Sequence, residues 1–275
     1  MTHSTPTFQP VLERPEPILS IQGVARRFVT NRHDTTALSS LSFDVYPGEF
    51  VCIVGPSGGG KSTLLNLIAG LDAPDDGAVL FEGARVRRAS QERIVVFQEP
   101  ALFPWLNVRQ NVEFGLKLRG VKGPALREAV DRSLELVHLT RFEHAYTHEL
   151  SGGMKQRAQL ARALTVQPQM LLMDEPFAAL DAQTRDVLQL ELQDLWAKTG
   201  TTIIFVTHNV REAVLLGDRV LVMTPAPGRI KAEITVDLPR PRNLESHSVV
   251  DLAARVRAEL QHGPAESEEN GGASA

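Results

Sequence analysis

One nine-residue stretch narrows the folds open to this chain more than any other feature. Residues 55–63, GPSGGGKST, fit the pattern G-x-x-x-x-G-K-[ST]; they follow an apolar run at 50–54 that is typical of a buried strand and open a helix-like stretch. Glycines let such a loop wind so that backbone N–H groups point at phosphate oxygens, and the helix adds its positive N-terminal end. The alternative, a turn that binds nothing, is disfavoured by the Lys-Ser pair. The stretch predicts a phosphate-binding loop.

Each polar group of this loop has an expected role. We expect Lys61 to bind the β- and γ-phosphates of a nucleotide and the Ser62 hydroxyl to ligate magnesium. The other loop residues are expected to line the nucleotide, and these are Gly55, Pro56, Ser57, Gly58, Gly59, Gly60 and Thr63.

A second apolar run ends in two carboxylates. MLLMD at 170–174 reads as a strand, so Asp174 and Glu175 should lie at the carboxyl edge of the sheet, where the phosphate loop also lies. Asp174 would then join the magnesium shell. Glu175 would polarise a water for attack on the γ-phosphate, because such a water needs an acceptor within hydrogen-bond reach. The alternative is that Asp174 only caps the loop that follows its strand.

Short apolar runs alternate with longer helical stretches along the chain, which predicts an α/β fold with a mostly parallel sheet. The expected strands are 41–45, 50–54, 94–97, 170–174, 202–206 and 219–223. The helix-compatible stretches are 64–71, 108–118, 126–139, 153–164, 182–196 and 211–216. Because no strand candidate falls within 108–165, we expect a helical insert there.

Composition and charge narrow the possible classes of protein further. The formal net charge of -4 gives no overall attraction to nucleic acid or anionic membranes. The single cysteine, Cys52, excludes an internal disulfide and favours a reducing compartment. The longest apolar run has five residues, far below the ~20 that a membrane-spanning helix needs, so we expect no such span. The proline-rich lead at 1–17 and the acidic tail at 263–275 are predicted to be disordered.

A second glycine-rich turn completes a recognisable series. LSGGMKQR at 150–157 opens a helix, so Ser151, Gly152 and Gly153 form a second candidate anion site, although Ser-Gly-Gly is also an ordinary helix cap. A phosphate loop, then LSGG some ninety residues on, then MLLMDEP about twenty residues later, resembles the ATP-binding cassette of ABC transporters. The resemblance covers about residues 18 to 240.

The resemblance adds site residues that spacing alone does not single out. It implies that Gln98 contacts magnesium and the attacking water, that Asp181 belongs to the nucleotide site, and that His208 contacts the γ-phosphate. It also implies that Phe28 stacks on adenine. The alternatives are a core position for Phe28 and an ordinary surface role for His208. Asn209 departs from the family, in which Asp usually follows the histidine.

Fold and assembly follow from the same resemblance. It implies the P-loop NTPase fold of ABC ATPases over 18–240, a mostly parallel core sheet with an antiparallel β part, and a helical subdomain at about 100–165. Residues 241–262 are expected to form a helical extension. It further implies ATP hydrolysis in a homodimer, each ATP lying between Lys61 of one chain and Ser151–Gly153 of the other. The expected cofactors are ATP and Mg²⁺.

The branch of the family is indicated by shorter stretches. FQEPALFPW at 97–105, PGRI at 227–230 and LPRPR at 238–242 resemble the importer ATPases for taurine, alkanesulfonates and nitrate. This implies a peripheral location on the cytoplasmic side of the cell membrane, permease subunits docked near Gln98 to Trp105, and an extracytoplasmic solute-binding protein as indirect partner. We expect Phe103 to be an anchor of that contact, unless Phe103 and Trp105 turn inward.

Two rival functions stay open at this point. One is an ABC-type ATPase that works on nucleic acid or ribosomes, but the chain lacks the coiled coils, zinc cysteines and second cassette of such proteins. The other is a non-catalytic nucleotide switch, against which the presence of both Glu175 and His208 argues.

Overall fold

The computed structural model describes residues 16–29 and 34–261. The predicted tail at 263–275 lies outside these residues, as does the predicted lead up to residue 15.

A six-stranded sheet forms the centre of the molecule, in the order β10-β9-β3-β8-β7-β6. Its strands are β3 (Phe50–Val54), β6 (Arg93–Val96), β7 (Met170–Asp174), β8 (Thr202–Thr207), β9 (Arg219–Met223) and β10 (Ile230–Thr235). Neighbouring strands are parallel except β10, which runs antiparallel to β9. β3, β7 and β8 are nearly continuous apolar runs because both faces of a parallel sheet are covered. The predicted parallel core is confirmed.

A second sheet is antiparallel, with the order β2-β1-β4-β5. Its strands are β1 (Leu19–Val29), β2 (Asp34–Val45), β4 (Asp76–Phe81) and β5 (Ala84–Arg85). The antiparallel part implied by the family resemblance is therefore present. Only the last part of β2, at 41–45, is apolar enough to have been predicted as a strand.

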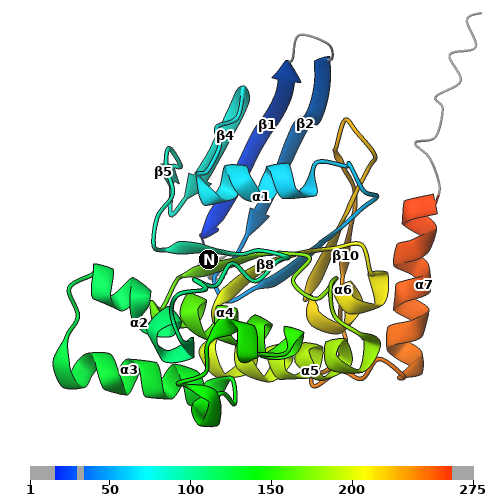
Figure 1. Ribbon diagram of the computed structural model, residues 1–275. Coiled ribbons are helices and arrows are strands. Elements are labelled where there is room, and N and C mark those ends of the chain that lie inside the picture. The colour runs from blue at the N-terminus through cyan, green and yellow to red at the C-terminus, as the bar shows by residue number, and fades with distance from the viewer. Residues whose placement is uncertain (1–15, 30–33, 262–275) are drawn as a thin grey trace, which may run out of the picture.

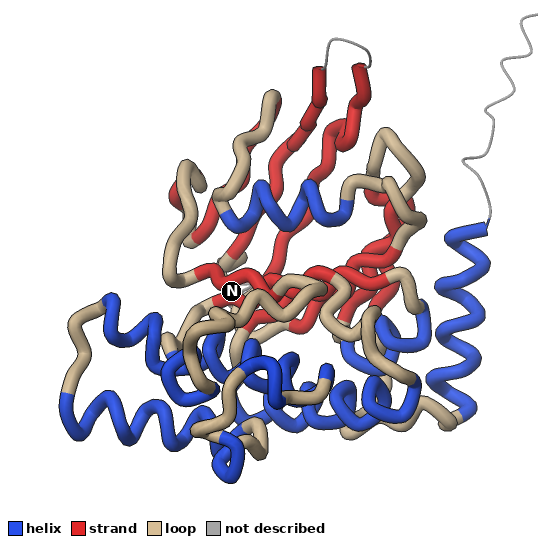
Figure 2. The backbone as a smooth tube through the Cα atoms, in the orientation of Figure 1, coloured by secondary structure: helices blue, strands red, loops and turns tan. Residues whose placement is uncertain are grey.

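The helices fill two layers, on opposite faces of the central sheet (Figure 1). They are α1 (Lys61–Ala69), α2 (Val108–Leu118), α3 (Gly123–Leu136), α4 (Gly152–Thr165), α5 (Ala182–Thr199), α6 (Val210–Leu216) and α7 (His247–Gln261), with two short 3-10 helices at Thr140–Phe142 and Thr147–Glu149. β3 shows the division: Val51 and Ile53 pack on the side of α1 and the antiparallel sheet, whereas Phe50 and Cys52 pack on the side of the other helices. Figure 2 shows strands above and below α1, and helices beneath the central sheet.

The helical stretch between β6 and β7 holds α2, α3 and α4, as the absence of strand patterns predicted. α2 starts at a capping box, in which the side chain of Asn107 accepts a hydrogen bond from the N–H of Gln110 and the side chain of Gln110 accepts one from the N–H of Asn107. After β10 the chain continues to α7, which packs on α6 and β9. None of the helices in the described part of the chain combines the length and the apolar composition of a transmembrane segment.

Candidate functional site

Four adjacent parallel strands deliver the candidate residues to one edge of the central sheet. β3, β8, β7 and β6 lie side by side in that order. Gly55 follows β3 directly, His208 follows β8, Glu175 follows β7, and Gln98 comes two residues after β6. Parallel strands end at the same edge, so residues far apart in sequence come together there, where α/β proteins bind ligands.

The phosphate loop is held in a shape that requires glycine at its end. Gly60 has a φ of +83°, and a Cβ at this position would lie 2.6 Å from Cδ2 of Leu38 and 2.7 Å from the carbonyl oxygen of Ala37. Within residues 16–29 and 34–261, no side chain caps α1, which begins at Lys61. The first N–H groups of α1 are therefore left for an anion in the loop.

Lys61 is buried inside this loop, with 6% of its surface exposed. Its Nζ donates hydrogen bonds of 3.0 Å to the carbonyl oxygens of Gly55 and Pro56. Burial lowers the pKa of Lys61, while the carboxylates of Glu175 and Asp174 act in the opposite direction. The loop therefore holds a desolvated cation close to both carboxylates, which is suited to binding phosphate.

Asp174 and Ser62 meet where the magnesium shell was predicted. Burial raises the pKa of Asp174, and the hydrogen bond with Ser62 and the charge of Lys61 oppose that rise. A hydroxyl and a carboxylate side by side are oxygen ligands that fit Mg²⁺, which proteins bind through few side chains with water and phosphate completing the shell.

Glu175 and His208 form a pair across two strands. Nδ1 of His208 lies 2.8 Å from Oε2 of Glu175. Glu175 has a φ of +45°, a left-handed conformation that is uncommon for a non-glycine residue, and its N–H donates to the carbonyl oxygen of Val206 at 2.9 Å. A cavity of about 20 Å³ adjoins the pair, which is room for one water. The structure therefore brings His208 and Glu175 together at this edge of the sheet.

The second glycine-rich turn lies next to the start of α5. Ser151 caps α4 by accepting a hydrogen bond from the N–H of Met154 at 3.3 Å. A Cβ on Gly153 would come within 2.7 Å of Cγ2 of Thr184, so a larger residue does not fit there. Asp181 caps α5 through the N–H of Thr184 at 3.0 Å, and this bond lowers the pKa of Asp181. Within one chain, then, the turn packs against α5.

Phe28 is a surface residue, because 41% of it is exposed. The guanidinium carbon of Arg26 lies 4.9 Å from the centre of its ring. Arg26 is itself fixed by two hydrogen bonds to Asp72, at 2.9 and 3.1 Å, and one of 2.8 Å to Asp75. The core position considered for Phe28 is wrong, and an ordered cation backs its ring.

Gln98 is exposed, and an aromatic cluster follows it in the chain. The ring of Phe103 lies 5.4 Å from that of Trp105 and 4.6 Å from that of Phe114. Trp105 is 70% exposed, so it does not turn inward. Phe103 is half-buried, with the guanidinium carbon of Arg162 from α4 5.3 Å from its ring centre.

Sequence reasoning missed several residues that shape this edge. Arg185 donates to the carbonyl oxygens of Phe177 and Leu180, at 3.2 and 2.7 Å, and so fixes the loop that follows Glu175. Gln159 on α4 donates to the carbonyl oxygen of the residue before Gln98, at 3.3 Å. Their partners are backbone atoms, which leave no mark in a sequence.

Comparisons with known proteins show which proteins the chain is similar to. Residues 38–178 match the sequence family described as ABC transporter. The nitrate import ATP-binding protein NrtD of Synechocystis is 48% identical over 80% of this chain and 83% of its own length. The aliphatic sulfonates import ATP-binding protein SsuB of Bacillus cereus is 41% identical over 89% of this chain and 96% of its own.

Solved structures show the same fold. The dimeric structure of an ATP-binding cassette in a post-hydrolysis state, bound to ADP and Pi, superposes with a TM-score of 0.71 at 30% identity. The match covers 80% of this chain and all of that one.

Proposed function

The chain belongs to the ABC transporter family, and we propose that it is the ATP-hydrolysing subunit of an importer for a small anion such as nitrate, an alkanesulfonate or taurine. The observation that carries this proposal is the 2.8 Å contact between His208 and Glu175. His208 follows β8, which lies next to β3, the strand that leads into the phosphate loop, and Glu175 follows β7, the next strand after β8. A nucleotide-binding scaffold without catalysis has no need for that pair.

The chain's own residues divide the chemistry among them. Lys61 and the N–H groups of α1 bind the phosphates, and Phe28 stacks on adenine. Ser62, Asp174 and Gln98 would hold Mg²⁺, which when bound neutralises charge on the β- and γ-phosphates. Glu175 accepts a hydrogen bond from the attacking water and orients it in line with the γ-phosphate. His208 holds Glu175 and contacts the γ-phosphate.

We propose that each site is completed by a second copy of the chain. Gly153 packs against Thr184 of α5 in its own chain, whereas Ser151 and Gly152 are exposed and so remain available to a neighbouring molecule. The helix that they open offers a second N-terminus for phosphate. The dimeric cassette with ADP and Pi supports this arrangement. Hydrolysis would then separate the two chains.

The output of this cycle is transport through separate membrane subunits. Trp105 and its aromatic neighbours are the surface that we assign to the permease, on the cytoplasmic side of the membrane. The transported solute meets the solute-binding protein and the permease, not this chain. The relatives that support the choice of solute are nitrate and aliphatic sulfonate import proteins.

Two measurements test the proposal. Co-expression with the permease genes and purification from membranes should yield a complex, and recovery with nucleic acid alone would instead support the nucleic-acid rival. Phosphate release from ATP and Mg²⁺ by the purified chain should be measurable. ATP binding without phosphate release, in the chain and in the complex, would identify a nucleotide switch.

A further inference from the structure

α6 carries a buried carboxylate that the mechanism above does not use. Glu212 is 5% exposed, and burial raises its pKa. Burying a carboxylate is costly unless its oxygens are hydrogen-bonded. Oε2 accepts a hydrogen bond from the hydroxyl of Thr207, and Oε1 accepts one from Nε2 of Gln189 on α5, at 2.8 Å. The position of Glu212 therefore depends on the end of β8 and on α5.

These bonds control the backbone on both sides of His208. Thr207 precedes the histidine and donates to Glu212, and the same Thr207 hydroxyl accepts a hydrogen bond from the N–H of Asn209 at 3.0 Å. The side chain of Asn209 in turn caps α6, accepting from the N–H groups of Arg211 at 3.0 Å and Glu212 at 3.4 Å. The His208 side chain is 59% exposed, so few neighbouring side chains pack against it. The position of its imidazole therefore depends on the backbone that carries it.

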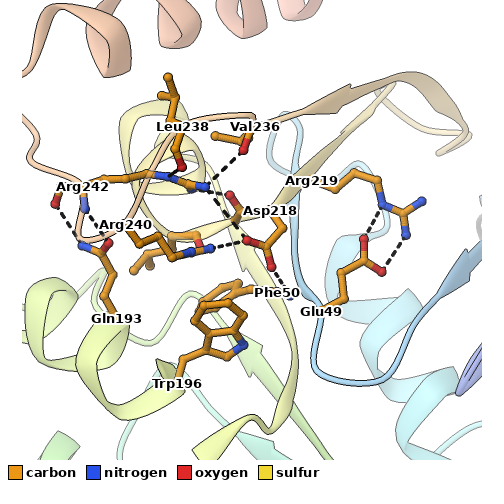
Figure 3. Close-up of polar contacts among 12 residues, drawn as sticks. Glu49, Phe50, Gln193, Trp196, Asp218, Arg219, Val236, Leu238, Arg240 and Arg242 are labelled. Carbon is orange, nitrogen blue, oxygen red and sulfur yellow. Dashed lines mark hydrogen bonds and ion pairs between the residues drawn. The ribbon is translucent and has the colours of Figure 1, made fainter. Parts of the chain in front are cut away.

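The other end of α6 is fixed as well. Nη1 of Arg242 donates to the carbonyl oxygen of Val214 at 3.0 Å, and the backbone of Arg242 exchanges two hydrogen bonds with Gln193 (Figure 3). Gln193 and Gln189 are four residues apart, so one face of α5 contacts Glu212 directly and reaches the second half of α6 through Arg242. Glu212 is therefore held by hydrogen bonds from β8 and α5, on a helix that is itself bonded to Arg242.

We propose that Glu212 is a positioning residue for His208. Its carboxylate holds Thr207, and through Thr207 the N–H of Asn209, so that the imidazole between them reaches Glu175 and the γ-phosphate. Glu212 itself does not touch the nucleotide. This assignment rests on the proposed function, because it needs His208 to act in hydrolysis.

A double-mutant cycle tests the assignment. Glu212→Ala and Thr207→Val should each lower kcat for ATP hydrolysis about tenfold and change KM less than twofold, because the phosphate loop is untouched. In a His208→Ala background, followed by single-turnover phosphate release, neither change should lower the rate further. Thr207→Val removes one hydroxyl at nearly constant volume, so it carries the test if Glu212→Ala does not fold.

The conservative variant gives a further readout. Glu212→Gln keeps an acceptor for Thr207, and Gln189 can turn its amide to accept from the new side chain, because Oε1 of Gln189 has no partner in the described part of the chain. We expect Glu212→Gln to retain most of kcat. Arg211→Ala, at an exposed position of α6, is the matched control and should retain all of it.

Different outcomes would contradict the positioning role of Glu212 and the proposed ATP hydrolysis on which it rests. Equal losses from Glu212→Ala and Thr207→Val in the presence and absence of His208 mean a general structural role, and unchanged kcat in both variants means no role. Either result contradicts the positioning of His208 but leaves ATP hydrolysis intact. A His208→Ala variant with wild-type kcat removes the basis of this inference, and wild-type protein without hydrolysis removes the proposed function.

Discussion

Nδ1 of His208 and Oε2 of Glu175 are 2.8 Å apart because β7 and β8 pair in parallel register, with Asp174 beside Val206. The N–H of Glu175 extends this ladder to the carbonyl oxygen of Val206. Glu175, the first residue beyond β7, and His208, the first beyond β8, thus lie at the same edge of the sheet. The sheet itself places an imidazole and a carboxylate in contact, next to the strand that leads into the phosphate loop.

The first prediction concerns Glu175. Glu175→Gln keeps the size and polarity of the side chain but removes its negative charge, so ATP should still bind while kcat falls about 10²–10⁴-fold. The arrested protein should accumulate as an ATP-bound dimer, visible as a doubled mass by light scattering. Loss of ATP binding would show instead that Glu175 mainly supports the fold of the site. Glu191→Gln on α5 is the control.

The second prediction concerns Lys61. Lys61→Ala removes a charged donor to phosphate and the two bonds to Gly55 and Pro56 that brace the loop. ATP affinity should fall roughly 10- to 100-fold, because a hydrogen bond to a charged group contributes about 1.5–3 kcal/mol, and hydrolysis should stop. Titration with a fluorescent ATP analogue measures the first effect. Lys198→Ala, exposed at the end of α5, should behave as wild type; an active Lys61→Ala variant would contradict the nucleotide assignment.

The central sheet could be predicted because its strands are buried on both faces and therefore apolar throughout, as Phe50–Val54 shows. The antiparallel sheet could not be predicted from residue patterns. The first part of β2, from Asp34 to Ser40, is polar and partly exposed, and its pairing with β1 depends on contacts between strands. Only the family resemblance indicated that an antiparallel part was present.

The residues of the candidate site also differ in whether a sequence pattern singles them out. Candidate residues whose proposed task depends on chain-local geometry, such as Lys61 after a glycine loop or Glu175 after an apolar strand, could be singled out by pattern. Glu212 was not, because its partner Gln189 comes from another helix and no spacing announces that contact. Asn209 was noted only as a departure, but its side-chain oxygen caps α6, so the change from Asp keeps the capping function.

The third prediction tests sharing of sites between chains. Lys61→Ala damages the phosphate loop, and Ser151→Arg blocks the turn that a partner would present. A mixed dimer then holds one site with both lesions and one intact site. If equal amounts of the two inactive proteins are mixed and chains exchange at random, about a quarter of all sites should be intact, so activity should return to about a quarter of the wild-type value. Two inactive populations that stay inactive, with mixed dimers demonstrated by native mass spectrometry, would contradict shared sites.

The fourth prediction concerns the cation behind Phe28. Phe28→Ala should weaken ATP binding about tenfold, because stacking of a base on an aromatic ring contributes about 1–3 kcal/mol. Arg26→Met should weaken it about two- to fivefold by freeing the ring. Neither change should affect binding of inorganic tripolyphosphate, which has no base. Arg27→Met, next on the same strand, is the control, and equal losses for ATP and tripolyphosphate would mean that Phe28 does not contact adenine.

The fifth prediction concerns Trp105, which is 70% exposed beside Phe103. An exposed indole on an aromatic cluster is a typical anchor for a helix of another protein, and loss of such an anchor costs about 2 kcal/mol or more of binding. Trp105→Ala should keep basal hydrolysis and thermal stability but weaken association with the permease roughly 30-fold, with loss of solute uptake. Phe103→Ala should also weaken association, but it should lower the melting temperature as well, since Phe103 is half-buried beneath Arg162. Phe142→Ala, at an exposed aromatic on the helical insert, is the control. Normal association and uptake in Trp105→Ala would place the permease contact elsewhere on the chain.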